Sequence, residues 1–211
     1  RQMSIRDSHK HCGHINDYVV LTSPSAWQAV RPQMAYEPRG LAYVTSQEEE
    51  FNQSVLTKLP KATHVLGVGG GMAIDAAKVI AAETQADLIL VPTIVSSGAI
   101  FQPHFPGRRN GRCIVLFDLI APQQVLFDTD IIHAAPPHLN ASGMAECVCW
   151  LGVVASWKWW CEQNLPGSPW DQNVANEVFD WVESRAQQYT ANLDANGRPG
   201  PMAIRASAEV N

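Results

Sequence analysis

The sequence predicts an α/β fold, in which a parallel sheet covered by helices is followed by an all-helical region. Three observations point to this class. Short apolar runs recur up to residue 128. Stretches with helical patterning separate those runs, and this arrangement is typical of a parallel sheet that is buried on both faces. Beyond residue 136, only helical patterns remain.

The first elements follow from apolar runs and a polar helix start. Residues 18–23, YVVLTS, are expected to form a strand, and a helix is expected to begin near Ser25. Residues 41–46, LAYVTS, form the second predicted strand. Ser46 and Glu49 then fit the Ser-x-x-Glu pattern of a capping box, which predicts that Ser46 caps the next helix.

The centre of the chain continues this alternation. Residues 63–68 are expected to form a third strand, residues 72–83 an alanine-rich helix, and residues 87–92 a fourth strand that Pro92 ends. Glycine and proline punctuate residues 96–112, so this segment is predicted to be irregular.

The last predicted strands precede two long helices. The strands are expected at residues 113–117 and 124–128, and the first long helix at about residues 140–160. The next helix is predicted to start with Ser168 as its N-cap and Pro169 at its first helical position.

We place a domain boundary near Ala135, between an α/β domain at residues 1–135 and a helical domain at residues 136–211. The helical domain is expected to be incomplete, because its last residues are typical of the middle of such a domain. The tryptophan-rich run at residues 150–160 keeps helical spacing and is expected to pack in the core and at the domain interface.

Composition excludes several functional classes. The chain is 46% hydrophobic, which is enough for a core and too much for a disordered protein. A net charge of −5 disfavours a protein that binds the nucleic-acid backbone. No apolar run approaches the length of a membrane span, so no membrane partner is expected. Five cysteines without a Cys-x-x-Cys pair favour a reducing, cytoplasmic setting.

A glycine run, Gly67-Val-Gly69-Gly70-Gly71, ends the third predicted strand and opens the helix after it. Glycines let the backbone approach an anion, and a helix N-terminus offers free N–H groups to it. Met72 stands where the Rossmann fingerprint needs its third glycine, and the Gly-Lys-Ser/Thr ending of an ATPase loop is missing. A tight turn without a ligand is the alternative interpretation.

Asp75 and Lys78 follow the glycines with i,i+3 spacing. Two interpretations stay open for this pair. It is either a solvated ion pair on the helix surface or a lysine directed at a phosphate group.

Three segments together resemble one superfamily. They are GVGGGMAIDAAK at residues 67–78, LILVPTIVSS at residues 88–97, and PQQVLFDTDIIHAAPPHLNASGMAEC at residues 122–147. This order of motifs is similar to that of the iron-containing alcohol dehydrogenases, glycerol dehydrogenase, glycerol-1-phosphate dehydrogenase and 3-dehydroquinate synthase. The resemblance covers most of residues 18–160.

The resemblance implies a nucleotide-binding α/β domain, a helical domain and an active site in the cleft between them. It further implies that Gly69, Gly70 and Gly71 hold the pyrophosphate of NAD or NADP, and that Thr93 and Ser96 line the cofactor site. The full predicted cofactor-binding set is Thr22, Gly69, Gly70, Gly71, Asp75, Lys78, Thr93 and Ser96. Thr22 is expected near the adenosine end.

The same resemblance makes Glu146 the first ligand of a divalent metal, zinc or iron. Dehydrogenases of the superfamily generally carry Asp there, whereas 3-dehydroquinate synthase carries Glu. The two further ligands of the superfamily are histidines, and this chain has no histidine after His138. Either these ligands lie beyond residue 211, which is the interpretation we favour, or the protein has no metal site. No catalytic residue is assigned, and Gly98 stands where many dehydrogenases of the glycerol branch carry Asp.

Two further clusters carry candidate binding groups. The first, near the N-terminus, could chelate a soft cation or could be an exposed terminus; it comprises His9, His11, Cys12 and His14. The second could bind a substrate phosphate or carboxylate or could be a solvated basic loop; it comprises Arg108, Arg109 and Arg112.

The sequence thus predicts an NAD(P)-dependent, divalent-metal-assisted oxidoreductase that acts on a small polyol, an alcohol or its phosphate. One alternative is a sugar-phosphate cyclase that resembles 3-dehydroquinate synthase. Another is a catalytically silent relative that only binds nucleotide. The expected partner is a small-molecule substrate, phosphorylated or not, with no nucleic acid; a homo-oligomeric state is left open.

Overall fold

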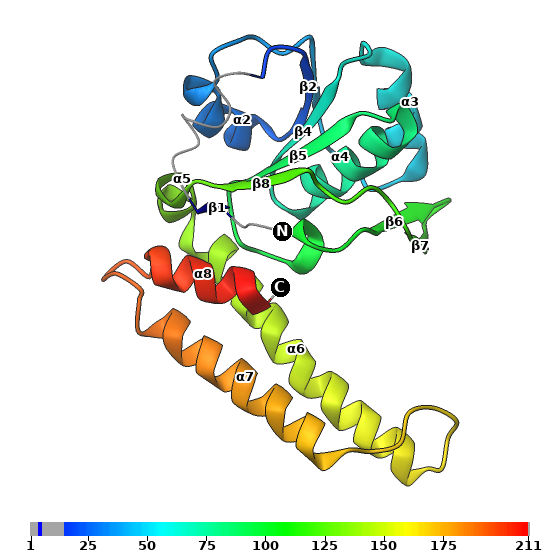
Figure 1. Ribbon diagram of the computed structural model, residues 1–211, viewed down its shortest axis with the longest axis vertical. Coiled ribbons are helices and arrows are strands. Elements are labelled where there is room, and N and C mark those ends of the chain that lie inside the picture. The colour runs from blue at the N-terminus through cyan, green and yellow to red at the C-terminus, as the bar shows by residue number, and fades with distance from the viewer. Residues whose placement is uncertain (1–3, 6–14, 211) are drawn as a thin grey trace.

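The computed structural model describes residues 4–5 and 15–210 of the chain (Figure 1). An α/β part comes first and a helical part follows, so the predicted fold class is confirmed. The candidate cation cluster of His9, His11, Cys12 and His14 lies outside the described residues.

A parallel sheet forms the centre of the α/β part, in the order β1-β8-β5-β4-β2-β3. Its strands are β1 (Ser4–Ile5), β2 (Tyr18–Thr22), β3 (Gly40–Tyr43), β4 (His64–Gly69), β5 (Asp87–Pro92) and β8 (Gln124–Phe127). Five of the six lie where apolar runs predict them. The short β1, which pairs with β8 at the sheet edge, has no such run and was missed.

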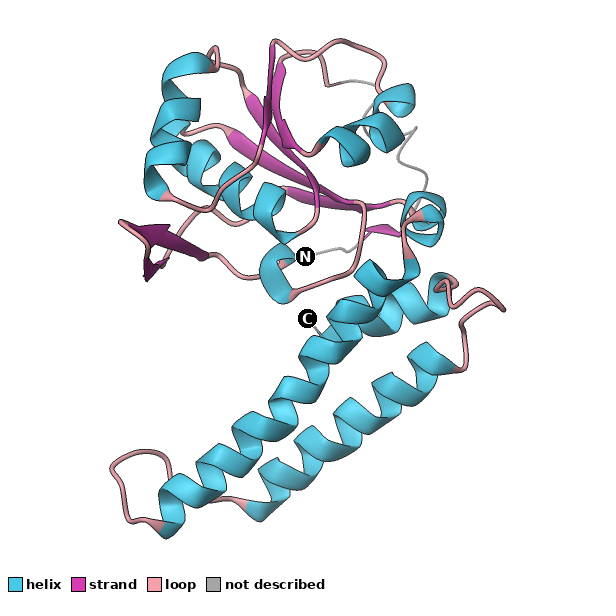
Figure 2. Ribbon diagram, turned by 180° about the vertical axis from the view of Figure 1, so that it is seen from behind, coloured by secondary structure: helices cyan, strands magenta, loops and turns pink. Residues whose placement is uncertain are grey.

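Helices cover both faces of this sheet (Figure 2). These helices are α2 (Pro24–Val30), α3 (Glu49–Lys58) and α4 (Gly71–Thr84), with 3₁₀ turns η1 (Arg31–Gln33) and η2 (Gly98–Ile100). Alternate residues of β2 show the two layers. Val19 and Leu21 belong to the apolar cluster that contains α4, whereas Val20 belongs to the cluster that contains α2. The sheet is therefore buried on both sides, as its continuous apolar strands indicate.

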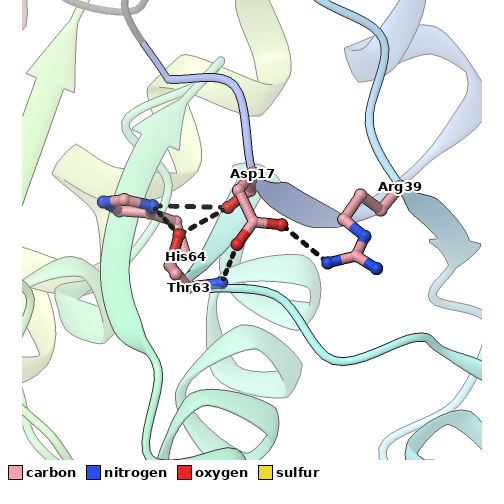
Figure 3. Close-up of polar contacts among 4 residues, drawn as sticks. All are labelled: Asp17, Arg39, Thr63 and His64. Atoms are coloured by element: carbon pink, nitrogen blue, oxygen red, sulfur yellow. Dashed lines mark hydrogen bonds and ion pairs between the residues drawn. The ribbon is translucent and has the colours of Figure 1, made fainter.

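A polar network ties the starts of three neighbouring strands together (Figure 3). Asp17, which precedes β2, accepts hydrogen bonds from Arg39 Nη1 and from the Thr63 backbone N–H, each at 3.0 Å. Thr63 Oγ1 donates to the Asp17 carbonyl at 2.9 Å and lies 2.8 Å from His64 Nδ1. Arg39 precedes β3 and Thr63 precedes β4, so one carboxylate aligns three strands at the edge where they begin.

The predicted capping box at the start of α3 is wrong. The N-cap is Glu48, and no side chain caps the helix. Ser46 Oγ instead accepts a hydrogen bond from the Glu48 backbone N–H at 3.0 Å, so the hydroxyl stabilises a turn one step before the helix.

A β-hairpin occupies part of the segment that was predicted to be irregular. Strands β6 (Phe105–Arg109) and β7 (Arg112–Leu116) pair antiparallel and form a sheet of their own. Asn110 and Gly111 connect them with φ values of 53° and 73°. Positive φ at both central residues is the requirement of a type I′ turn, for which Asn-Gly is the strongest sequence signal. The prediction of residues 113–117 as a strand is correct, but that strand lies outside the parallel sheet.

Four helices follow the last strand: α5 (Thr129–Ala134), α6 (Pro137–Glu162), α7 (Gln172–Thr190) and α8 (Pro201–Val210). The long helix predicted near residues 140–160 is confirmed as α6, and α5 was not predicted. The N-cap of α7 is Asp171 rather than Ser168. Its Oδ1 accepts from the backbone of Asn173 at 2.8 Å, whereas the Ser168 carbonyl accepts from Trp157 Nε1.

Helices α6 and α7 run side by side away from the sheet, and α8 returns to it (Figures 1 and 2). Ile204 and Ala208 of α8 belong to the apolar cluster between the sheet and α4. Ala203 and Ala206 of the same helix belong to the cluster between α6 and α7. Because α8 serves both cores, the domain division at residue 135 remains a prediction.

The middle and the end of α6 carry exposed aromatic side chains. Trp159 and Trp160 are 55% and 44% exposed, and Trp150 is 43% exposed. The expectation that this run packs in a core is therefore wrong for these three residues. The rings of Trp157 and Trp170 lie 4.7 Å apart, centroid to centroid, and fasten the loop between α6 and α7.

Helix α6 is also long and apolar enough to cross a membrane, by length and composition alone. The sequence-based expectation that no run approaches such a length is wrong on this measure. A helix from the core of a water-exposed protein passes the same test, so this finding does not place α6 in a membrane.

Candidate functional site

The glycine run lies at the carboxyl end of β4, where α4 begins. Gly69 has a φ of +141°, a conformation that residues with a side chain rarely adopt. A Cβ on Gly70 would lie 2.8 Å from Ile94 Cδ1, and one on Gly71 would lie 3.1 Å from Ser97 Oγ. The glycines therefore let the loop after β5 lie directly against the turn.

No side chain caps the N-terminus of α4, whose N-cap is Gly70. The first N–H groups of a helix have no partner within the helix, and the helix dipole makes this end attractive to anions. The turn thus combines close backbone access with available donors, which is the chemistry a phosphate group needs.

Three predicted hydroxyl residues surround the same edge of the sheet. The Thr93 backbone N–H donates to the Gly69 carbonyl at 3.1 Å. Ser96 Oγ lies 3.8 Å from the position of a Cβ on Gly70. Thr22 ends β2 and pairs in register with Val68, one residue before the glycine turn. The structure therefore gathers these residues with the glycines at the carboxyl edge of the sheet, where open parallel sheets bind ligands.

Asp75 and Lys78 form an ion pair in the interior rather than on the helix surface. Lys78 Nζ lies 2.7 Å from Asp75 Oδ1, and the two side chains are 1% and 4% exposed. Burial raises the pKa of Asp75, and the neighbouring Lys78 opposes that shift. Lys78 Nζ also donates to the His104 carbonyl at 3.1 Å. The interpretation as a solvated pair is wrong, and the ammonium group is engaged within the protein rather than directed at the glycine turn.

A cavity of about 340 Å³ opens beside the glycine turn. Gly71 and Asp75 of α4 form one wall, and Ser97 and Gln102 of the loop after β5 form another. His104 and Glu146 also line it, from the hairpin side and from α6. Residues from both the sheet part and the helical part therefore enclose one space next to the turn.

Glu146 reaches this cavity with a perturbed carboxyl group. Partial desolvation raises the pKa of Glu146, although the residue stays exposed, and a hydrogen bond from the Gly98 backbone opposes the shift. Among the described residues, no group of three or more His, Cys, Asp or Glu side chains could hold a metal ion. A catalytic zinc needs about three protein ligands, so Glu146 by itself does not form the predicted metal site.

Residues of two helices hold the loop after β5 against the helical part. Asn140 is fully buried; its Oδ1 accepts from the Val95 backbone N–H at 3.0 Å, and its Nδ2 donates to the Ile132 carbonyl at 2.8 Å. Ser207 Oγ donates to the Val95 carbonyl at 3.4 Å. Gly143 lies so close that an added Cβ would be 2.0 Å from the Val95 oxygen. We call Asn140, Gly143 and Ser207 the Val95 clasp.

The sequence did not single out the Val95 clasp as functional. Asn140 and Gly143 lie in a motif that was noted for its resemblance, but their contacts depend on a loop 45 residues away from Asn140 along the chain. Nothing in the local pattern indicates such a contact.

The arginines of the hairpin take no part in the cavity lining. Arg109 Nη2 lies 2.8 Å from Glu49 Oε1 and forms an ion pair with it. The Arg108 backbone N–H donates to the Gln47 carbonyl at 3.0 Å, which fastens the hairpin to the segment before α3. The geometry therefore gives these residues a surface role.

A second groove, of about 390 Å³, lies between β3 and α3. Its lining includes Arg39, Tyr43 and Lys58 but none of the predicted site residues. Although this groove is slightly larger, it lies apart from the glycine turn, so the smaller cavity is the candidate site.

Comparison with known proteins gives consistent matches. A family model described as iron-containing alcohol dehydrogenase matches residues 14–136. Glycerol-1-phosphate dehydrogenase [NAD(P)+] of Methanothermobacter thermautotrophicus is 39% identical over 94 residues, 44% of this chain and 27% of the relative. The enzyme of the same name from Thermoplasma volcanium is 32% identical over 168 residues, 70% of this chain and 47% of the relative.

Solved structures agree on the fold. The glycerol dehydrogenase of Schizosaccharomyces pombe superimposes with a TM-score of 0.68 and 20% identity, over 92% of this chain and 52% of that protein. The chain thus spans about half, or less, of the length of these relatives.

Proposed function

Because the chain belongs to the iron-containing alcohol dehydrogenase family, we propose that it binds NAD or NADP at the glycine turn and transfers hydride to or from a small substrate in the adjoining cavity. The proposed substrate is a small polyol, an alcohol or its phosphate. The single observation that carries the proposal is the uncapped N-terminus of α4, built from glycines, beside a cavity lined by both parts of the chain.

The proposed cofactor site consists of the turn and its neighbours. Gly69, Gly70 and Gly71 would hold the pyrophosphate through backbone N–H groups. Thr93 and Ser96 would line the adjoining part of the dinucleotide, and Thr22 would lie toward the adenosine end. Lys78 is left out of the direct contacts, since its ammonium group is buried against Asp75 and the His104 carbonyl.

The cavity suits the substrate because its volume and lining match a small oxygen-rich molecule. Gly71 belongs both to the turn and to the cavity wall, so a substrate in the cavity would lie against the cofactor. Ser97 and Gln102 offer neutral hydrogen-bonding groups to hydroxyls. The cofactor supplies the hydride chemistry, and the chain supplies orientation and exclusion of water.

The proposal includes a divalent metal, zinc or iron, for which the chain offers one ligand. Glu146 would supply one oxygen ligand at the cavity wall. The described residues offer no ligand group of three around it, and a single carboxylate does not hold such an ion. We therefore derive no step of the reaction through the metal.

The identity of Glu146 favours a second candidate. The run Gly143-Met144-Ala145-Glu146 is the form that resembles 3-dehydroquinate synthase rather than the dehydrogenases. A cyclase of that kind would use NAD transiently and eliminate phosphate from a sugar phosphate.

One assay separates the candidates. The purified protein is incubated with NAD⁺ or NADP⁺ and a panel of polyols and polyol phosphates, and with sugar phosphates in parallel. Net formation of reduced cofactor supports the dehydrogenase. Release of phosphate without net reduction supports the cyclase. Cofactor binding measured by calorimetry, with neither product, would leave only nucleotide binding. We also propose that the protein acts in the cytoplasm on small molecules rather than on nucleic acid.

A further inference from the structure

We propose that His104 is a substrate-binding residue, whose imidazole takes the phosphate group of a small polyol phosphate in the cavity beside the glycine turn. This inference rests on the proposed function and names the group that would select a phosphorylated substrate.

The charges around the cavity point to His104. Among the described residues that line it, His104 is the one basic side chain, and the acidic ones are Asp75 and Glu146. Lys78 does not line the cavity, but its Nζ lies 2.7 Å from Asp75 Oδ1 and offsets the charge of that carboxylate. Glu146 forms no ion pair among the described residues, so in its ionised form it repels an anionic group from the α6 wall. The groups that remain to bind such an anion are the N-terminus of α4 and the imidazole of His104.

Hydrogen bonds and strand pairing fix the backbone at His104 and at both of its neighbours. Lys78 Nζ donates to the His104 carbonyl at 3.1 Å. The next residue, Phe105, begins β6 and pairs with Leu116. One residue earlier, the Pro103 carbonyl accepts from the Leu119 backbone N–H at 2.8 Å. A ligand therefore meets a fixed backbone at His104 and does not have to order this segment, which reduces the entropic cost of binding.

The ring itself is also supported. The Phe117 ring lies 6.1 Å from the His104 ring, centroid to centroid, in a tilted contact. Imidazole carries an N–H donor in its neutral and its protonated form, and hydrogen bonds to charged groups are the stronger ones. Ser97 and Gln102 line the same cavity and would bind the remaining oxygens.

The test compares two substitutions of His104. His104→Gln keeps a hydrogen-bond donor but removes the imidazole, and His104→Ala removes both. His138→Gln is the matched control, because His138 is exposed on α6 and does not line the cavity. Binding of glycerol 1-phosphate, inorganic phosphate and glycerol is measured by calorimetry without cofactor, so that no substrate is turned over. Cofactor binding by itself is measured for each variant.

The expected result is selective. His104→Ala weakens glycerol 1-phosphate and inorganic phosphate by about tenfold, the loss expected for a hydrogen bond to a charged group. Affinity for glycerol and for the cofactor stays within about twofold, and His138→Gln matches the unmodified protein. Partial recovery in His104→Gln would support a donor role.

Two results would overturn the proposal: equal phosphate affinity in His104→Ala and the unmodified protein, or no phosphate binding by the unmodified protein. The binding readout is independent of turnover. A protein that binds phosphate through His104 but forms no reduced cofactor would retain this inference while the proposed dehydrogenase activity fails.

Discussion

At two positions of this chain glycine is required because a side chain would take space that another group needs. Gly143 lets α6 contact the backbone of the loop after β5, because an added Cβ would lie 2.0 Å from the Val95 oxygen. Backbone cannot move aside as a flexible side chain can. The close approach therefore depends on this residue type.

We expect Gly143→Ala to lower the free energy of unfolding by about 2 kcal/mol or more, since overpacking against fixed backbone displaces the loop and strains the Val95 clasp. Gly152→Ala is the matched control on the same helix, because nothing lies within 4 Å of its added Cβ. That control should be neutral or stabilise by up to about 1 kcal/mol. Urea denaturation measures both, and equal midpoints for the two variants would contradict the prediction.

Gly70 gives the second residue-scale prediction. A valine there would meet the far end of the Ile94 side chain, which can rotate away, so the fold should survive. The added bulk would still occupy the space in which a phosphate approaches the turn. We expect Gly70→Val to lose detectable binding of NAD and NADP, measured by calorimetry, with an unchanged circular dichroism spectrum. Normal cofactor binding by this variant would show that the turn is not the cradle.

At the scale of elements, the ion pair inside α4 carries a stability cost if it is broken. Asp75→Asn leaves the Lys78 ammonium buried without its counter-charge, and a loss of about 3 kcal/mol is expected from such a break. Lys78→Met should cost as much or more, since it also removes the bond to the His104 carbonyl. The double variant should lose less than the sum of the two, as measured by chemical denaturation. Strict additivity would mean that the two groups do not interact.

The strand-aligning network gives a pH-dependent prediction. Hydrogen bonding from Arg39, followed by the Thr63 backbone, lowers the pKa of Asp17 below its usual value of 3.8. A depressed pKa in the folded state means that Asp17 stabilises the fold above about pH 3.8 and loses this effect as the pH falls through the lowered value.

Asp17→Asn should therefore lower the melting temperature at pH 7, and the difference from the unmodified protein should shrink on acidification below the usual pKa of aspartate. Thermal unfolding followed by circular dichroism at several pH values measures this. A difference that stays constant from pH 7 to the acid limit would show that the carboxylate charge is not the cause. Asp87→Asn is a control, because Asp87 is exposed at the start of β5.

Element prediction from this sequence succeeds where one local signal decides. Continuous apolar runs identify β2 through β5 because such runs fit only positions covered on both sides. The prediction fails where two signals compete. Ser168 with Pro169 and Asp171 both look like helix starts, and the start at Asp171 prevails while Trp157 holds the Ser168 carbonyl. The Asn110-Gly111 turn signal was present but masked by the surrounding prolines and glycines.

For the candidate site, the sequence predicts residues that share one turn but not those that meet across the chain. The glycines, Thr93 and Ser96 stand next to predicted strand ends, so their convergence follows from the topology of a parallel sheet. Whether Lys78 points outward depends on packing against the hairpin, which has no local signature. His104 and Asn140 gain their places only from long-range contacts.

On the scale of the whole molecule, the sheet part and the helical part are joined by shared packing contacts. The return of α8 to the sheet and the Val95 clasp fix α6 against the loop after β5. A change in either part is therefore expected to alter the cavity through these contacts, although α6 and α7 extend away from the sheet (Figure 1).

The placement of the tryptophans has a practical consequence for spectroscopy. Six of the seven lie between Trp150 and Trp181, and only Trp27 belongs to the sheet part. Intrinsic tryptophan emission from this protein will thus report mainly on the helical part and very little on the sheet part. Unfolding midpoints from tryptophan emission and from far-ultraviolet ellipticity should coincide only if both halves melt together. A difference between the two midpoints would show that the helical part unfolds separately from the sheet part.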